Sequence, residues 1–87
     1  MVRLNFDGAA RRGKVTVRGV LRDEKGNVLV AYLGKLGMGT NNEAEAMALL
    51  WGLKIVVEMR IKKLSIEGDS KLTIDVVKGR TQPGWAL

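Results

Sequence analysis

Three acidic residues occupy positions where the chain is expected to change direction and where a metal ion could be held. Asp7 precedes Gly8, Glu45 follows a pair of asparagines, and Asp69 follows Gly68. Carboxylate oxygens are the ligands that hard divalent cations prefer. The chain has no cysteine and no histidine, which excludes thiolate and imidazole metal sites and Ser-His or Cys-His nucleophiles. Any chemistry must therefore rest on carboxylates, amides, hydroxyls and cations, and a zinc site is not expected.

The elements that position these acids begin with an antiparallel meander. Apolar and polar residues alternate over residues 2–7 and again over Lys14–Arg22, which is the period of a strand with one buried face. A turn sequence at residues 23–27 leads into the short β-branched run 28–33. Residues 64–67 are expected to form a fourth short strand.

Helices are expected before and after this fourth strand. Thr40 and Glu43 fit the capping box, in which each side chain accepts a hydrogen bond from the backbone amide of the other residue. The first helix should reach about Met59, and a second helix should begin after Ser70 and end before Gly79. The order βββαβα then places the fourth strand parallel to an earlier one through a helical crossover.

Glu45 is the most informative of the three acids. At about 100° per residue, it lies opposite the polar stripe of the first helix and in line with Leu49, Gly52 and Val56. A carboxylate on that arc is costly unless a cation meets it. Two structural alternatives remain open: a partner such as Arg3 could reach Glu45, or the side chain could escape at the exposed first turn.

Asp7 and Asp69 each follow a predicted strand. If those strands are parallel neighbours, their carboxyl ends lie side by side, where open α/β sheets bind ligands. An Asp-Gly or a Gly-Asp-Ser sequence alone is usually a turn or a helix cap. Together with Glu45, however, the two aspartates would form a cluster of like charges, which is sensible only around divalent cations. The sequence therefore predicts a site for Mg²⁺ or Mn²⁺.

In combination these motifs resemble the ribonuclease H family. The resemblance rests on Asp-Gly-Ala at residues 7–9, Thr-Asn-Asn-x-x-Glu at residues 40–45 and Gly-Asp-Ser at residues 68–70. Longer segments that include these motifs, such as Leu-Asn-Phe-Asp-Gly-Ala-Ala and Asn-Asn-Glu-Ala-Glu-Ala, are similar to the plant reverse-transcriptase-associated, retroelement-type branch of the family. The resemblance implies a ribonuclease H-like α/β fold. We predict that residues 1–87 form a single domain that lacks the family's fifth strand and last helix.

The resemblance also implies an activity. Members of the family are metal-dependent endonucleases that hydrolyse the RNA strand of RNA–DNA hybrids by a two-metal mechanism. By similarity, Asp7, Glu45 and Asp69 are the catalytic residues and the ligands of Mg²⁺ or Mn²⁺, and Glu45 also senses the ribose 2′-hydroxyl. The residues expected to bind nucleic acid are Gly8, Arg11, Arg12, Lys14, Asn41, Asn42, Ser70 and Lys71.

Two departures from the family pattern keep other functions open. The family's fourth carboxylate lies beyond the point where this sequence stops, and Asp75 is expected on the polar side of the second helix. The loop after Asp7 is basic, with Arg11, Arg12 and Lys14, where the family has glycine and proline. A non-catalytic RNA or hybrid binding domain with an incomplete metal site is therefore the main alternative, and a structural fragment or interaction module of a longer polyprotein is another.

Charge and hydropathy limit the partners. The net charge is +6, from fifteen Lys and Arg against nine acids, which favours a polyanionic partner such as nucleic acid. Apolar stretches are too short to span a bilayer and no signal peptide is recognisable, so an intracellular protein of the cytoplasm or nucleus is expected. Loss of a fifth strand would expose the edge of the fourth, and we predict self-association through that edge.

A phosphate-binding loop is a less favoured interpretation of the segment that follows Asp7. Gly8 to Lys14 fits the pattern G-x-x-x-x-G-K after a strand. Val15, however, stands where the motif needs Ser or Thr, and the residues that follow alternate as a strand.

Overall fold

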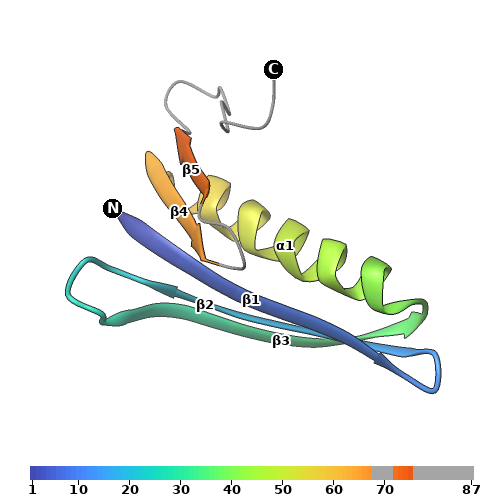
Figure 1. Cartoon of the computed structure of the whole chain (residues 1–87). Helices are drawn as coiled ribbons and strands as arrows, with labels where there is room; N and C mark the ends of the chain where they lie inside the picture. The colour runs from blue at the N-terminus through green and yellow to red at the C-terminus, as the bar shows by residue number, and fades with distance from the viewer. Residues whose placement is uncertain (68–71, 76–87) are drawn as a thin grey trace.

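A sheet covered on one face by a single helix makes up the part of the chain that the structure, a computed structural model, describes: residues 1–67 and 72–75. Helix α1 (Asn41–Glu58) runs across the sheet (Figure 1). No helix within the described ranges is long and apolar enough to cross a membrane. The strands are β1 (Val2–Arg11), β2 (Lys14–Arg22), β3 (Val28–Met38), β4 (Lys63–Glu67) and β5 (Leu72–Asp75), in the spatial order β3-β2-β1-β4-β5.

The antiparallel meander and the parallel fourth strand are confirmed. β1 pairs with β2 and β2 with β3 in antiparallel fashion, while β4 lies parallel to β1 with Glu67 opposite Asn5. The crossover between β3 and β4 is made by α1, as a parallel pair requires. The first and third strands are longer than predicted and reach Arg11 and Met38. Pairing across β2 extends both strands into Gly-rich and Ala-rich segments whose own pattern is not that of a strand.

The second helix predicted after Ser70 is wrong for residues 72–75. These residues form β5, which pairs antiparallel with β4, with Leu72 opposite Ile66 and Asp75 opposite Lys63. A strand here satisfies the backbone groups along the outer edge of β4, which helical spacing alone could not reveal. β4 is therefore not an exposed edge, and the reason given for self-association no longer holds. Ser70 itself lies outside the described residues.

The core lies between α1 and the sheet and has two parts. α1 buries every fourth residue, Ala44, Ala48, Gly52 and Val56, and the small side chains among them allow close packing. One cluster is made of Leu4, Leu21, Val56, Leu64 and Ile66, and the second is made of Val15, Val17, Ala44 and Ala48. The second cluster lies under the N-terminal half of α1, the half that carries Glu45.

Tyr32 fastens the β3 strand to the helix. Its hydroxyl donates a hydrogen bond of 2.6 Å to the carbonyl oxygen of Ala48. Partial burial raises the pKa of this hydroxyl, so it remains a donor throughout the neutral range. A Cβ at Gly52 would lie 2.9 Å from the Tyr32 hydroxyl oxygen and 2.7 Å from Leu4 Cδ2, so glycine is what lets the helix approach here.

The predicted capping box is present at the start of α1. The Glu43 amide donates to Thr40 Oγ1 at 3.1 Å, and the Thr40 amide donates to Glu43 Oε1 at 3.0 Å. We expect Thr40→Ala to lower the free energy of unfolding by about 1 kcal/mol, because one amide of the first turn loses its partner. Urea denaturation measures the effect, with Thr40→Ser as the control that keeps the hydroxyl. Equal stabilities of the alanine and serine variants would contradict this role.

Candidate active site and nucleic-acid interface

The middle of β1 touches the first turn of α1 through Gly8. This glycine is buried, and a Cβ built on it would lie 2.1 Å from the carbonyl oxygen of Ala44 and 2.6 Å from the amide nitrogen of Glu45. Real Cβ atoms do not come this close to backbone atoms, so the contact is one of backbone against backbone. Asp7 and Glu45 are therefore carried by two segments that are in direct contact, although they are far apart in the sequence.

Two further hydrogen bonds join the end of β1 and the turn that follows it to the segment where α1 begins. The Ala10 amide donates to Asn41 Oδ1 at 2.8 Å. The Gly39 amide donates to the carbonyl oxygen of Gly13 at 2.7 Å. Asn41 and Asn42 are both exposed. The residues predicted to bind nucleic acid, Gly8, Asn41 and Asn42, thus lie together where β1 packs against the start of α1. The side-chain oxygen of Asn41 is already used in a hydrogen bond within the fold.

Glu45 is exposed, which corrects the prediction that it lies on the buried arc of the helix. The buried stripe keeps the predicted Gly52 and Val56, but in the first half of the helix it passes through Ala44 and Ala48 in place of Glu45 and Leu49. The alternative of escape at the first turn is the one found. No hydrogen bond or ion pair of the Glu45 side chain occurs within the described residues, and Arg3 does not pair with it. Its carboxylate is therefore available to a ligand.

Asp7 is also exposed and is paired with Arg18. Leu4 and Gly8 face α1, so strand alternation directs Asp7 to the opposite face of the sheet. Arg18 lies directly across from it on β2, and its Nη2 is 3.0 Å from Asp7 Oδ2. The side chain of Asp7 is 58% exposed and that of Arg18 is 69% exposed. Ion pairs as exposed as this contribute at most about 1 kcal/mol to the free energy of unfolding. Nothing in the spacing of the sequence singles out Arg18, because only the strand register places it here.

The third predicted acid, Asp69, lies outside the described residues, as do Ser70 and Lys71. β4 ends at Glu67, opposite Asn5 of β1 and two residues short of Asp7. Among the side chains that the structure describes, those of residues 1–67, no group of three or more potential metal ligands occurs. The meeting of all three carboxylates thus stays a prediction. The two described acids fit a hard cation in their donor chemistry, since both offer exposed carboxylate oxygens.

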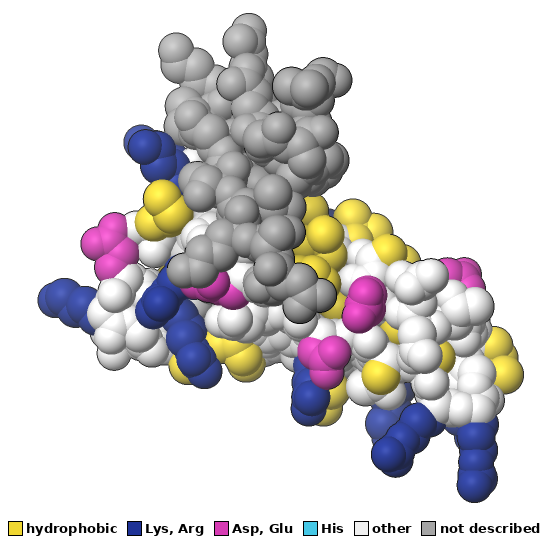
Figure 2. Space-filling model, in the orientation of Figure 1, with side chains coloured by type: hydrophobic (Ala, Val, Ile, Leu, Met, Phe, Trp, Pro, Cys, Tyr) yellow, Lys and Arg dark blue, Asp and Glu magenta, His cyan; other side chains and the backbone are white. Residues whose placement is uncertain are grey.

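The β1–β2 hairpin carries the basic residues that follow Asp7. Arg11 lies opposite Lys14, and the turn residues Arg12 and Gly13 have φ angles of 51° and 78°, as a type I′ turn requires. Arg11, Arg12, Lys14 and Thr16 line a shallow depression. Figure 2 shows dark blue Lys and Arg side chains projecting at the lower right, where Figure 1 places this hairpin. The hairpin leads into a strand and not a helix, so a phosphate-binding loop is not formed.

The comparisons with known proteins match this arrangement of strands and helix. Residues 5–86 fit the model of a family described as reverse transcriptase-like. The chain belongs to this family. Its fold is ribonuclease H-like: the ribonuclease H1 of the halophilic archaeon Halobacterium salinarum NRC-1 has a TM-score of 0.74 and 31% identity, over 79% of this chain and 54% of that one. No curated protein matches the chain.

Two other solved ribonucleases H are similar to the reverse transcriptase-like chain. LC11 ribonuclease H1, in complex with an RNA/DNA hybrid, has a TM-score of 0.71 and 28% identity, covering 80% of this chain and 55% of that one. The N-terminal ribonuclease H domain of rv2228c from Mycobacterium tuberculosis has a TM-score of 0.73 and 26% identity, covering 79% and 55%. The chain thus spans about half the length of these structures.

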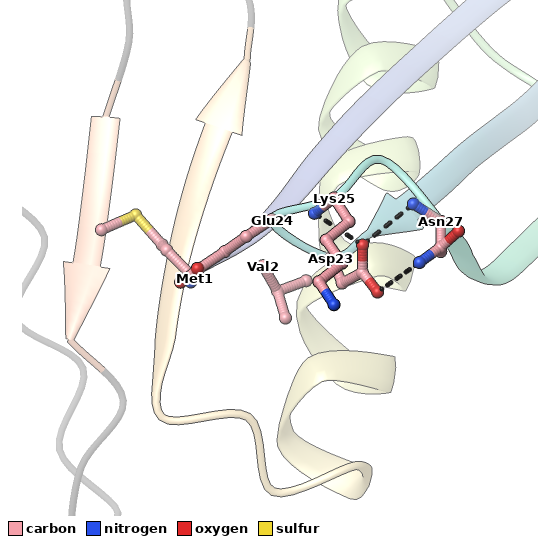
Figure 3. A pocket seen from close by; sticks show the side chains of 6 residues that line it. All are labelled: Met1, Val2, Asp23, Glu24, Lys25 and Asn27. Carbon is pink, nitrogen blue, oxygen red and sulfur yellow. Dashed lines mark hydrogen bonds and ion pairs between the residues drawn. The ribbon is translucent and has the colours of Figure 1, made fainter.

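A second depression of the ribonuclease H-like sheet lies at the β2–β3 turn, at the other end of β2 from the basic hairpin (Figure 3). Figure 3 shows the Asp23 carboxylate held by Lys25 and Asn27. It accepts from the Asn27 side-chain amide at 3.1 Å and from the backbone amides of Lys25 and Asn27 at 2.9 Å each. These bonds, that of the Asn27 side chain first, lower the pKa of Asp23. The carboxylate organises the turn and is not aimed at a ligand.

This turn predicts a pH dependence of stability. The pKa of Asp23 is below its ordinary value of 3.8 in the folded chain, so its ionised form stabilises the fold above about pH 4. That contribution is lost as the pH falls through the folded pKa. We expect wild type to melt at a higher temperature than Asp23→Asn at pH 6, and the difference to shrink towards pH 2.5. Circular dichroism melts measure it, and a difference that does not vary with pH would contradict the assignment.

Proposed function

We propose that this chain binds RNA–DNA hybrids and hydrolyses their RNA strand with divalent metal ions. The single observation that carries the proposal is the contact of Gly8 with the backbone of Ala44 and Glu45, which brings the Asp7 strand and the Glu45 helix together. Membership of the reverse transcriptase-like family and the likeness to ribonucleases H support it. That one of these structures was solved with an RNA/DNA hybrid supports the choice of substrate.

The proposed metal ligands are Asp7, Glu45 and Asp69, with Mg²⁺ or Mn²⁺ as the ion. When bound, the ions would activate the attacking water and stabilise the leaving 3′ oxygen, so that products carry a 5′-phosphate. The chain's own part is positioning: Gly8 sets the separation of the two backbones, and Glu45 offers an exposed carboxylate with no partner among the described residues. Asp7 is exposed as well, but its side chain lies on the face away from α1 and must turn towards Glu45 for both to hold the same ion. Arg18 must release Asp7 Oδ2 for that oxygen to bind metal.

The proposed nucleic-acid interface surrounds these acids. Its described part joins the basic hairpin to the helix start through the Ala10–Asn41 hydrogen bond. Cations at the hairpin suit the phosphates of the hybrid, whose neutralisation releases counterions. Exposed amides at the helix start suit hydrogen bonds in the minor groove, where the 2′-hydroxyl identifies RNA. The residues proposed are Gly8, Arg11, Arg12, Lys14, Asn41 and Asn42, together with Ser70 and Lys71.

A cleavage assay on matched duplexes tests the proposal. The same sequence is prepared as an RNA–DNA hybrid, as double-stranded RNA and as double-stranded DNA, with the 5′ end labelled. We expect the RNA strand of the hybrid to be cut in Mg²⁺ or Mn²⁺ and to stay intact in EDTA, and both homoduplexes to survive. Cleavage that persists in EDTA, or that is equal for hybrid and double-stranded RNA, would contradict the proposed mechanism.

A non-catalytic hybrid or RNA binding domain is the second candidate. The ion pair between Arg18 and Asp7 favours it, because a cation of the chain itself already neutralises one of the acids that would hold the metal ions. This alternative predicts hybrid binding in EDTA that a divalent ion does not strengthen, with no cleavage in any ion. Fluorescence anisotropy with a labelled hybrid, run beside the cleavage assay, separates the two functions.

A further inference from the structure

The face of the sheet that α1 does not cover is strongly basic. The core residues of β1, β2 and β4 point towards α1, and on β3 the residues Val30, Tyr32 and Leu36 pack against the same core. Alternation therefore directs the remaining side chains of these four strands to the other face. Cations there outnumber the two acids, Asp7 and Glu67. The cations are Arg3, Arg11, Lys14, Arg18, Arg22, Lys35 and Lys63, and we call this set the open basic face.

The open basic face cannot be recognised from the order of residues in the sequence, because its cations come from four different strands. Only the register brings Arg18 opposite Asp7 and Lys35 opposite Thr16 on the same side of the sheet. The face is continuous with the hairpin, where Arg11 and Lys14 end β1 and begin β2. Figure 2 shows Lys and Arg side chains along the lower margin of the molecule, the side away from α1 in Figure 1.

We infer that the open basic face binds the phosphate backbone of a nucleic acid without reading its sequence, and that it does so in the absence of metal. This inference deepens the proposed function and rests on it. Most of the cations of the face are arginines, whose guanidinium groups bind phosphate through two parallel hydrogen bonds. A surface of this charge gives affinity with a steep salt dependence and little discrimination among sequences.

The aromatic residues show why the contact is with phosphates and not with bases. Phe6 and Tyr32 pack into the core, and Trp51 belongs to α1 on the covered side of the sheet. None of the described aromatic rings therefore offers a stacking platform on the open basic face, and stacking is what single-strand binding sites use. A duplex, which presents phosphates and keeps its bases stacked inside, suits this face better than a single strand.

The apolar edge of the same face defines the rival ligand. Leu33 is 70% exposed and Leu29 is 42% exposed on β3. An anionic membrane surface would attract the cations and receive these leucines. Arg18 lies opposite Leu33, but the cations extend well beyond this edge, over all four strands and onto the hairpin, which favours nucleic acid. Membrane binding is therefore treated as an outcome of the test.

The test compares two variants that lose the same charge. Arg18→Gln/Lys35→Gln removes two cations from the open basic face, and Lys25→Gln/Lys54→Gln removes two exposed cations from the β2–β3 turn and from α1. Binding of a labelled hybrid and of a DNA duplex is measured by anisotropy in EDTA over a series of salt concentrations. We expect the first variant to lose about tenfold in affinity and to lower the salt slope by about 1.8, since each phosphate contact contributes about 0.9. The second should bind like wild type.

The outcomes are distinguishable once circular dichroism melts show that both variants are folded. Equal losses in the two variants, or no loss in the first, would overturn the inference. Tighter binding to phosphatidylserine vesicles than to duplex, removed by Leu33→Ser, would overturn it in favour of a membrane. If wild type binds no nucleic acid at all, the proposed function fails as well. If Arg12→Gln or Asn42→Ala weakens binding while the Arg18/Lys35 variant does not, only the inference fails.

Discussion

Gly8→Ala is expected to lower the free energy of unfolding by about 3 kcal/mol or more, near the upper end of the usual cost of overpacking. The added Cβ would lie 2.1 Å from the carbonyl oxygen of Ala44 and 2.6 Å from the amide nitrogen of Glu45. Both are backbone atoms, so no change of rotamer relieves the clash, and β1 must move away from α1. That movement also strains the hydrogen bond between Ala10 and Asn41. Urea denaturation followed by circular dichroism measures the loss.

Gly37→Ala is the matched control for this substitution. Gly37 also lies in a long strand of the same sheet, but a Cβ there meets no atom within 4 Å and its φ is not positive. Its free energy of unfolding should stay within about 0.5 kcal/mol of wild type. Similar effects at the two glycines would show that Gly8 is not needed for close packing. If the Gly8 variant remains folded at low temperature, its hybrid cleavage should fall as well, because the strand that carries Asp7 is displaced.

Asp7→Asn is expected to reduce metal-dependent cleavage of the hybrid by about 10³-fold or more. The substitution keeps the shape of the side chain but removes the charge that would hold the ions, and an ion contributes several kcal/mol to the stabilisation of the transition state. Stability should change little, because Asp7 is exposed and its ion pair with Arg18 contributes at most about 1 kcal/mol. Single-turnover cleavage in Mg²⁺ and in Mn²⁺ is the measurement.

Asp23→Asn provides the same chemical change at a site that should not matter for cleavage. Asp23 holds the β2–β3 turn, away from the basic hairpin, and should leave the cleavage rate unchanged at neutral pH. Hybrid affinity of the Asp7 variant in EDTA should equal or exceed that of wild type, because Arg18 is then free to contact phosphate. Retention of full activity by Asp7→Asn would remove the metal mechanism. Binding without cleavage by wild type would favour the non-catalytic alternative instead.

The outline of the fold could be predicted because its signals are local. Alternation of apolar residues indicates β1, β2 and the start of β3, and the capping box at Thr40 places the beginning of α1. The parallel placement of β4 follows from the helical connection. The ends of the strands were less well predicted, since Ala9 and Ala10 are in β1 only because Thr16 and Val15 of β2 pair with them.

Other features are decided by contacts between segments that are distant in the sequence. Leu72–Asp75 has apolar spacing that suits a helix, but the free edge of β4 draws it into the sheet. Gly52 and Val56 of α1 are buried as predicted, but Glu45 is exposed because the sheet accepts the small residues Ala44 and Ala48 in the first half of the helix. Helical periodicity alone locates the buried face of a helix only to within about one residue. Packing against the sheet decides which of two neighbouring residues is buried.

The sequence by itself determined the class of the fold, the residue types at the candidate site and the overall positive charge. Only the tertiary structure showed that Gly8 is the point where β1 touches α1, that Arg18 faces Asp7, and that cations from four strands gather on one face. The physical reason is that motifs and periodicity depend on neighbours along the chain. Strand register and backbone contact depend on packing between segments, which local patterns do not encode.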